Sequence, residues 1–328
     1  RLRDFYRQLP ARATALPEPA RISFCMIVRD EEEMLPDCLA SLGDAMHELI
    51  VVDTGSTDRT VEIAESFGAR VLSFPWNGSF SDARNHGLEA ATGEFIFWLD
   101  ADERLEPGDA ERLAELTRQR WREAFWLVET NFTGQEEVGT AATHLALRLF
   151  RNRPAYRFSG AIHEQLRSQM PADLPERFTT CDLRIRHYGY LKARIDERDK
   201  HARNLKLLEE ELARTPDSPF THFNIGTEHI AAGDAVTAER HFQRAYELVS
   251  REERWQEFGY SSLLAIRLVS SKRMLGKLDE VDRLVPAFLE LFPGFTDLIF
   301  ERGIAARDRG DHDGARAAYE ECLALGDA

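Results

Sequence analysis

The stretch EFIFWLDADE (94–103) places a short apolar run directly before an acidic cluster. A short apolar run between polar residues predicts a strand buried on both faces, as in a parallel sheet. The earlier stretches RISFCMIV (21–28), HELIVVD (47–53) and RVLSF (70–74) are also apolar, and a segment with helical character follows each of them. This alternation with short connections predicts a parallel sheet with helices on both faces.

Two helices after these strands begin with residues that favour helix N-termini. Asp30, with Glu33 three residues later, is a candidate cap for the helix after the first strand. Ser81 is a candidate cap for the helix that runs to about Ala91. Beyond Asp102 the rhythm changes, and we expect a mixed, partly antiparallel extension of the sheet. Its strands are predicted at 123–132, 143–150 and 178–187, with a helix near 109–120.

From about residue 192 the pattern becomes helical throughout. The stretch 223–248 is similar to 298–325, and 261–293 between them has the same layout, with a glycine at each turn. Gly276 and Gly310 are separated by about 34 residues, the period of tetratricopeptide repeats. We expect about three helical hairpins stacked as a short solenoid. The predicted segments are an N-terminal extension (1–20), an α/β domain (21–191), a linker helix (192–215) and helical repeats (216–328).

The composition predicts a soluble globular protein, with 43% hydrophobic and 30% charged residues. The net charge of −15 argues against nucleic-acid binding and against docking on anionic lipid. No apolar run approaches the roughly 20 residues of a membrane span. The four cysteines are scattered, which predicts buried free thiols in a cytoplasmic protein rather than a zinc site or a redox pair.

The acidic cluster at Asp100 and Asp102 is the most informative local feature. It follows a buried strand at the carboxyl edge of the sheet, where open α/β sheets bind ligands. Two carboxylates one residue apart can share a divalent cation and a ribose hydroxyl, and Mg²⁺ or Mn²⁺ then completes its shell with phosphate oxygens and water. Loop capping is the commoner explanation of an isolated pair, but the position at this strand end favours ligand binding.

Asp53 in VVDTGSTD (51–58) closes the second strand at the same edge. A Rossmann nucleotide site would need GxGxxG after the first strand, yet Arg29, Asp30 and Glu31 stand there. A P-loop is absent as well. Asp53 therefore serves a nucleotide held without a glycine-rich phosphate cradle, or it only closes a turn.

These motifs together resemble a known enzyme family. MIVRDEE (26–32), VVDTGSTDRT (51–60) and FSDARNHGLEAATGEFIFWLDADE (80–103) look like a family-2 inverting glycosyltransferase of the GT-A fold. RFSGAIHEQ (157–165) and RHYGY (186–190), with the helical tail, are similar to the branch that includes the SunS-type peptide S-glycosyltransferases. The same layout also occurs in many uncharacterised bacterial glycosyltransferases. The resemblance implies a GT-A, Rossmann-like sheet followed by tetratricopeptide-like repeats.

The resemblance also implies a nucleotide-sugar donor, most often a UDP-sugar, and a divalent metal, Mn²⁺ or Mg²⁺. By motif position, Asp53 contacts the base, with Arg29 or Asp30 close to it. Arg84 approaches the base or the diphosphate. The Asp100-Ala101-Asp102 motif completes the donor site.

In that motif, Asp100 lies near the ribose, Ala101 belongs to the donor-binding turn, and Asp102 binds the metal. Trp76 is in a loop near the same edge and is a candidate wall of the donor or acceptor pocket, because aromatic side chains often line such pockets.

Inversion is a single displacement, so one carboxylate must take the acceptor's proton. The resemblance places Glu164 in this position; a structural salt bridge is the alternative. His163 holds the acceptor or orients Glu164. His187 is a candidate metal ligand, since neutral imidazole binds Mn²⁺, or else a buried hydrogen-bonding histidine.

The expected function is metal-dependent transfer of a sugar to a Cys, Ser or Thr side chain of a peptide or protein. The solenoid would hold part of this acceptor, because repeat surfaces suit extended partners; it could instead support a homodimer. A transferase of cell-surface glycan or glycolipid synthesis is the alternative enzyme. A non-catalytic repeat scaffold with a degenerate transferase domain is the alternative of another class.

Overall fold

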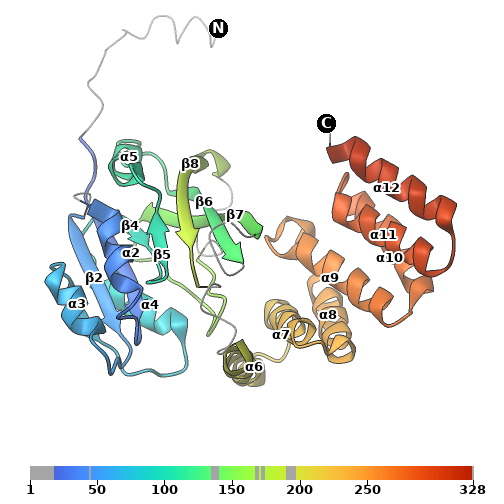
Figure 1. Ribbon diagram of the computed structural model, residues 1–328, viewed down its shortest axis with the longest axis horizontal. Helices are drawn as coiled ribbons and strands as arrows, with labels where there is room; N and C mark the ends of the chain where they lie inside the picture. The colour runs from blue at the N-terminus through green and yellow to red at the C-terminus, as the bar shows by residue number, and fades with distance from the viewer. Residues whose placement is uncertain are drawn as a thin grey trace, which may run out of the picture. The chain divides into compact units, whose positions relative to one another are not determined.

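A computed structural model describes most of the chain (Figure 1). The described residues are 18–43, 46–133, 140–166, 170, 174–189 and 197–326. Most of the expected N-terminal extension and the start of the expected linker lie outside them. The chain divides into two compact units, residues 1–195 and 196–328, and each is described by itself.

The first unit is built on an eight-stranded mixed sheet of order β3-β2-β1-β4-β7-β6-β8-β5. Strands β1 to β4 are parallel to their neighbours in this group, β7 is antiparallel to β4 and β6, and β8 is parallel to β6 and antiparallel to β5. The predicted parallel half and mixed extension are thereby confirmed. The strands are β1 (Ile22–Val28), β2 (Glu48–Asp53), β3 (Arg70–Ser73), β4 (Phe95–Trp98), β5 (Glu103–Leu105), β6 (Ala124–Thr133), β7 (Thr140–Arg151) and β8 (Phe178–His187).

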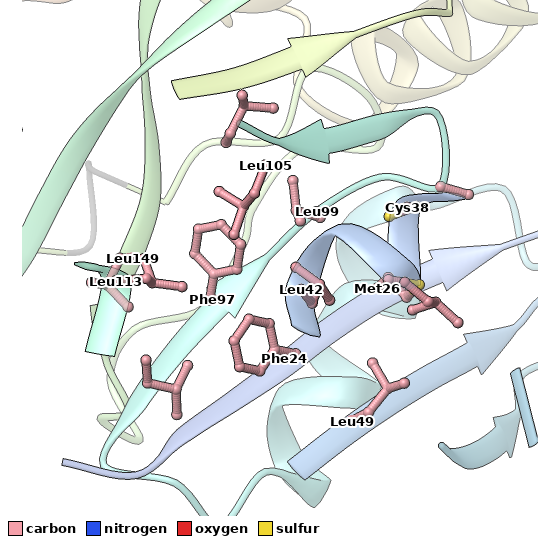
Figure 2. Packing of buried hydrophobic residues seen from close by; sticks show 14 of the residues in the cluster. Phe24, Met26, Cys38, Leu42, Leu49, Phe97, Leu99, Leu105, Leu113 and Leu149 are labelled. Atoms are coloured by element: carbon pink, nitrogen blue, oxygen red, sulfur yellow. The ribbon is translucent and has the colours of Figure 1, made fainter. Parts of the chain in front are cut away.

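Helices cover both faces of this sheet. On one face, α2 (Leu35–Leu42), α3 (Thr60–Ser66) and α5 (Asp109–Leu116) contribute to the larger apolar core. Its centre contains Phe24 and Phe97, whose rings meet edge to face at 5.5 Å (Figure 2). On the other face, α4 (Phe80–Ala90) packs with residues of the loop after β7. Removal of this apolar surface from water stabilises the sheet and fixes the strand ends that carry polar residues.

Both predicted helix caps are wrong, and the reasons concern the site. Helix α2 begins after Met34 with no side-chain cap, while Asp30 has a left-handed backbone and accepts hydrogen bonds from Thr57 in the loop after β2. Helix α4 is capped by Ser79. Ser81 instead donates its hydroxyl hydrogen to the carbonyl of Gly160, 2.6 Å away. Asp30 and Ser81 therefore each bond to a loop that is distant in sequence.

The second unit is entirely helical in its described part. Three helical hairpins, α7/α8, α9/α10 and α11/α12, turn at Gly233, Gly276 and Gly310, whose positive φ angles of 83°, 71° and 83° favour glycine. None of the described helices is long and apolar enough to cross a membrane. The helices are α6 (Glu197–Arg214), α7 (Pro219–Ala231), α8 (Ala235–Val249), α9 (Ser261–Met274), α10 (Leu278–Leu291), α11 (Thr296–Asp308) and α12 (His312–Gly326).

Repetition is visible in the packing of these hairpins. Gly226 of α7 lies against the ring of Phe242 of α8, and Gly303 of α11 lies against the ring of Tyr319 of α12. In each case a Cβ at the glycine would come within 2.7 Å of the ring, so the small residue is needed for close helix packing. The expected repeats are thus present. Helix α6, which the sequence suggests to be a linker, packs on α7, where Asn204 donates to Glu228.

Three histidines of the repeats lie together on α7 and α8. The Nδ1 atoms of His222 and His241 are 3.0 Å apart, and the ring of His229 stacks near that of His241. Burial, reinforced by the neighbouring histidines, lowers the pKa of His241 to about 4.

The cysteines are all free, but only Cys25 and Cys38 are buried, so the prediction of four buried thiols is half right.

Candidate active site

The strand ends predicted to bind a ligand do lie at one edge of the sheet. Val28 and Asp53 are opposite each other at the ends of β1 and β2, and Asp100 follows β4 on the other side of β1. The backbone of Asp100 is held on both sides. Its N–H donates to Glu103 over 2.9 Å, and its carbonyl accepts from the buried thiol of Cys38. The acidic turn is therefore rigidly placed.

Arg84 joins Asp100 to Glu164. Its Nη2 donates to Oδ1 of Asp100 and its Nε donates to Oε1 of Glu164, both over 2.9 Å. The Arg84 side chain is only 8% exposed. Its third nitrogen, Nη1, is buried and has no hydrogen-bond partner among the described residues. Burial opposes ionisation of Asp100, but the guanidiniums of Arg84 and Arg148 outweigh it and hold the pKa of Asp100 below its usual range.

The loop that carries Glu164 is tied to α4, which also carries Arg84. Asn85 exchanges two hydrogen bonds with the backbone of Phe158, each 2.9 Å long. The N–H of Phe80 donates to the carbonyl of Ala161 over 2.9 Å. These bonds, with that of Ser81, place the carboxylate of Glu164 beside Arg84. His163 is exposed and has a φ of 55°, a strained conformation for a residue with a side chain.

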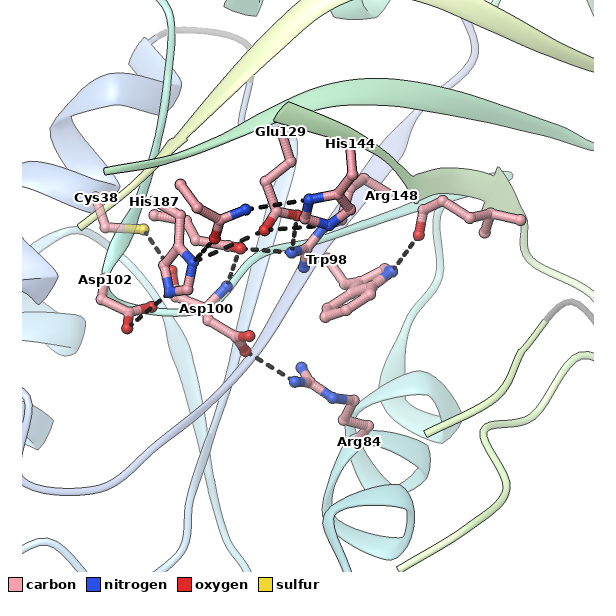
Figure 3. A network of polar contacts seen from close by, with 12 residues as sticks. Cys38, Arg84, Trp98, Asp100, Asp102, Glu129, His144, Arg148 and His187 are labelled. Atoms are coloured by element: carbon pink, nitrogen blue, oxygen red, sulfur yellow. Dashed lines mark hydrogen bonds and ion pairs between the residues drawn. The ribbon is translucent and has the colours of Figure 1, made fainter. Parts of the chain in front are cut away.

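Asp102 and His187 form a second pair, with His187 Nε2 3.2 Å from Asp102 Oδ2 (Figure 3). His187 ends β8, where it is opposite Glu103 of β5 and Asn131 of β6. Burial disfavours the imidazolium, but the hydrogen bond and attraction between the imidazolium and Asp102 outweigh burial and raise the pKa of His187.

Gly189, two residues after His187, leaves room beside the side chains of Asp102 and His187. A Cβ at Gly189 would lie 2.2 Å from Oδ2 of Asp102 and 2.7 Å from Nε2 of His187. Only glycine therefore leaves the carboxylate and the imidazole unobstructed. Their separation suits two adjacent ligands of one cation, which lie roughly 3 Å apart when each is at about 2.1 Å.

Behind this pair lies a buried charged cluster that sequence reasoning missed. Arg148 of β7 donates to Glu103 and, over 2.7 Å, to Glu129. Burial raises the pKa of Glu103 to about 8; Arg148 opposes this rise, while Asp100 and Glu129 add to it. No local motif marks Arg148 or Glu129, because only strand pairing brings them to the site.

The site carries an excess of negative charge. Five carboxylates and two guanidiniums belong to the network that links Glu164, through Arg84 and Asp100, to Asp102. A proton on Glu103 would remove one of these negative charges, and the carboxylates would still outnumber the guanidiniums. Carboxylate oxygens with one imidazole are a donor set that Mn²⁺ and Mg²⁺ accept. The residues present therefore fit a divalent cation at Asp102 and His187, and Arg148 already serves as the counter-charge for Glu103 and Glu129.

The residues expected to bind the nucleotide form a separate group at the end of β2. Asp53 accepts hydrogen bonds from the backbone of Gly55 and Ser56, so its carboxylate closes the turn. Asp30 accepts from Thr57 over 2.7 Å, which ties the loops after β1 and β2 together. Arg29 beside it has a largely exposed side chain. The turn role of Asp53 is thus visible, and contact with a base stays a prediction.

Three other residues of the motif region differ in exposure. Trp76 is half-buried and packs edge to face on Phe80 at 4.7 Å. Ala101 is buried in the core, so only its backbone is available to a ligand. Trp98 is half-buried, and the guanidiniums of Arg84 and Arg148 lie over its ring at 4.3 and 3.8 Å. Trp98 therefore supports both arginines of the site.

Comparison with known proteins agrees with this architecture. Residues 23–160 match the family described as Glycosyl transferase family 2. This part of the chain is a family 2 glycosyltransferase domain. Its mixed sheet has the expected GT-A class of fold, followed by the helical repeats.

Two curated relatives extend the match toward the helical unit. The chain is 40% identical over 226 residues to a TPR repeat-containing protein of Synechococcus elongatus, covering 67% of this chain and 55% of the relative. It is 31% identical over 206 residues to the SPbeta prophage-derived glycosyltransferase SunS of Bacillus subtilis, covering 62% and 48%. The chain thus spans about half the length of these relatives. Among solved structures, S. aureus TarS 1-349 is 15% identical, covering 92% of this chain and 90% of that one, with a TM-score of 0.41.

Proposed function

We propose that this protein transfers a sugar from a nucleotide-sugar donor, in a metal-dependent displacement with inversion, to a polypeptide side chain. The observation that carries the proposal is the arrangement at the end of β4. Arg84 holds Asp100 and Glu164 there, beside the pair Asp102 and His187, within a family 2 glycosyltransferase domain.

The donor half of the site is assigned to Arg84, Asp100, Asp102 and His187. A nucleoside diphosphate is an anion, and the site is already negative, so a cation is needed between them. Asp102 and His187 would hold it, and it would act as a Lewis acid toward the departing diphosphate. The guanidinium of Arg84 lies beside Asp100, and a guanidinium forms strong charge-assisted hydrogen bonds with phosphate oxygens. The donor class we favour is a UDP-sugar.

Glu164 is the proposed general base. As the acceptor oxygen or sulfur forms its bond to the anomeric carbon, its proton passes to the carboxylate of Glu164. The bond from that carbon to the diphosphate breaks, and the electron pair leaves with the nucleoside diphosphate. The hydrogen bond from Arg84 orients the carboxylate, which is only 14% exposed, for this transfer. His163 lies next to it and is exposed, so it is a candidate contact for the acceptor.

The acceptor we favour is a peptide or protein with a Cys, Ser or Thr nucleophile. Support comes from the helical hairpins, whose stacking produces the kind of surface that binds extended chains. The relative from Synechococcus elongatus, whose match covers 67% of this chain, is itself named for TPR repeats. A homodimer built on the same repeats is the competing use, and light scattering of the intact chain distinguishes a monomer from a dimer.

Two measurements test the proposal. A thermal-shift panel of nucleotide sugars with Mn²⁺ identifies the donor, because a ligand of the folded state raises its stability with concentration. Mass spectrometry then follows transfer from that donor to peptides with Cys, Ser or Thr. Transfer only to a glycan or a lipid-linked acceptor would instead support the alternative enzyme, a transferase of cell-surface glycan or glycolipid synthesis. No stabilisation and no turnover with any nucleotide sugar would leave the scaffold alternative.

The free cysteines favour a reducing compartment, and we propose the cytoplasm.

A further inference from the structure

We propose that Asn131 is a positioning residue that sets the tautomer of His187, and that His144 sets the orientation of the Asn131 amide. The inference rests on the proposed metal site at Asp102 and His187. It concerns residues that no motif marks and that reach the site only through the pairing of β6, β7 and β8.

Strand pairing places Asn131 and His187 side by side. They are opposite each other on the neighbouring strands β6 and β8. Oδ1 of Asn131 lies 2.5 Å from Nδ1 of His187. The other ring nitrogen, Nε2, is 3.2 Å from Asp102. His187 therefore faces an amide oxygen through Nδ1 and a carboxylate through Nε2.

The donors and acceptors of these contacts follow from the orientation of the Asn131 amide, whose nitrogen faces His144. Nδ2 of Asn131 lies 3.1 Å from Nδ1 of His144. An amide nitrogen can only donate, so Nδ1 of His144 accepts, and the amide oxygen is the atom that faces His187. Because an amide oxygen can only accept, the proton of His187 must be on Nδ1. In the neutral ring Nε2 is then unprotonated and directed at Asp102.

The far side of His144 agrees with this assignment. With Nδ1 as an acceptor, the neutral His144 ring carries its proton on Nε2, which lies 3.6 Å from Oε1 of Glu129. Glu129 is itself bound by Arg148 (Figure 3). The same Oε1 lies 3.8 Å from Nδ1 of His187, as suits a protonated Nδ1. The carboxylate of Glu129 thus favours a proton on Nε2 of His144 and a proton on Nδ1 of His187.

The opposite amide orientation would have a different chemical result. Its nitrogen would donate to Nδ1 of His187, Nε2 would carry the proton, and the ring would only hydrogen-bond to Asp102. A protonated Nε2 cannot bind a cation, whereas an unprotonated one is the usual imidazole ligand. Asn131 therefore decides between His187 as a metal ligand and His187 as a structural histidine.

The test measures Mn²⁺ binding to the full chain and the tautomer of His187. Asn131→Leu removes the acceptor at similar size and should weaken Mn²⁺ binding about 10- to 100-fold, as expected for a lost partner of a metal-ligating histidine. Asn131→Asp keeps an acceptor oxygen and should bind Mn²⁺ much as the wild type does. Free Mn²⁺ is followed by electron paramagnetic resonance. Nitrogen-15 NMR of the metal-free wild type, with the ring neutral, should show the His187 proton on Nδ1.

Asn152→Leu is the matched control, because the side-chain amide of Asn152 donates to the carbonyls of Ala91 and Gly93, away from the site. It should leave Mn²⁺ affinity unchanged. If His187→Ala weakens Mn²⁺ binding while Asn131→Leu does not, this inference is wrong and the metal site stands. If the wild type binds no Mn²⁺, or His187→Ala has no effect, the metal site fails and the inference with it. A proton on Nε2 of wild-type His187 overturns the inference even if Asn131→Leu does not fold.

Discussion

Arg84 donates a hydrogen bond from Nε to the carboxylate of Glu164 over 2.9 Å. The same guanidinium binds Asp100 through Nη2, so one side chain connects the proposed donor half and acceptor half of the site. Helix α4 carries this arginine and, through Ser81 and Asn85, also holds the loop that contains Glu164. The geometry of both halves therefore depends on the packing of a single helix.

Glu164→Gln tests the proposed base. The amide oxygen can still accept from Arg84, but the side chain can no longer take a proton. We expect a transfer rate about 100- to 10,000-fold lower, the range for loss of a general base, with nearly unchanged donor affinity. Single-turnover transfer and calorimetric titration of the donor measure the two quantities. An equal loss of both would make Glu164 a donor contact or a structural residue.

Arg84→Lys tests the connection between the two halves. A lysine ammonium cannot reproduce the two-carboxylate geometry of the guanidinium, so we expect weaker donor binding by about 10- to 100-fold, the value of a charge-assisted hydrogen bond. Arg151→Lys is the control, since Arg151 is a partly buried arginine that is stacked on Phe95 away from the site. Similar donor affinities in the two variants would count against a role of Arg84 in donor binding.

Gly189→Ala tests the space beside Asp102 and His187. The new Cβ would overlap the Asp102 carboxylate, so one of the two side chains must move. We expect Mn²⁺ affinity to fall roughly tenfold or more, as when a ligand loses its orientation, while circular dichroism stays unchanged. Gly259→Ala is the control because, apart from its two chain neighbours, no atom of the described residues lies within 4 Å of its added Cβ. Unchanged Mn²⁺ affinity in Gly189→Ala would place the cation elsewhere.

His241 predicts a pH dependence for the helical unit. Its pKa is about 4 in the folded protein, because of burial and of His222 beside it, against about 6.5 in an unfolded chain. Between these values the unfolded state binds a proton that the folded state does not, so the free energy of unfolding falls as the pH falls through this window. His241→Asn should flatten this acid limb in urea denaturation followed by circular dichroism. Identical slopes for both proteins would contradict the assignment.

The sequence predicts the framework because apolar runs and strand–helix alternation are local properties. The last strand, expected at 178–187, has these bounds in the structure. The acidic turn also lies where the preceding apolar strand, β4, predicts it. The caps at Asp30 and Ser81 were mispredicted because each side chain binds a loop distant in sequence, and no local pattern records such a partner.

The charged interior of the site could not be predicted for a related reason. Arg148, Glu129 and Asn131 lie on strands whose composition suggests only a sheet. Their roles arise from register, which sets Asn131 opposite His187 and Glu129 opposite His144. A shift of one residue would turn these side chains to the other face. Motif reading finds residues at strand ends, whereas the groups that orient them depend on tertiary pairing.

The central claim is that this chain uses a divalent cation at Asp102 to release a nucleoside diphosphate from a nucleotide sugar. Release of UDP from UDP-sugars, measured with and without Mn²⁺, tests it most directly. We predict metal-dependent release by the wild type, loss of this release in Asp102→Asn, and wild-type behaviour in Asp182→Asn. The side chain of Asp182 on β8 is 82% exposed. Metal-independent release, or equal rates in Asp102→Asn and the wild type, would contradict the claim.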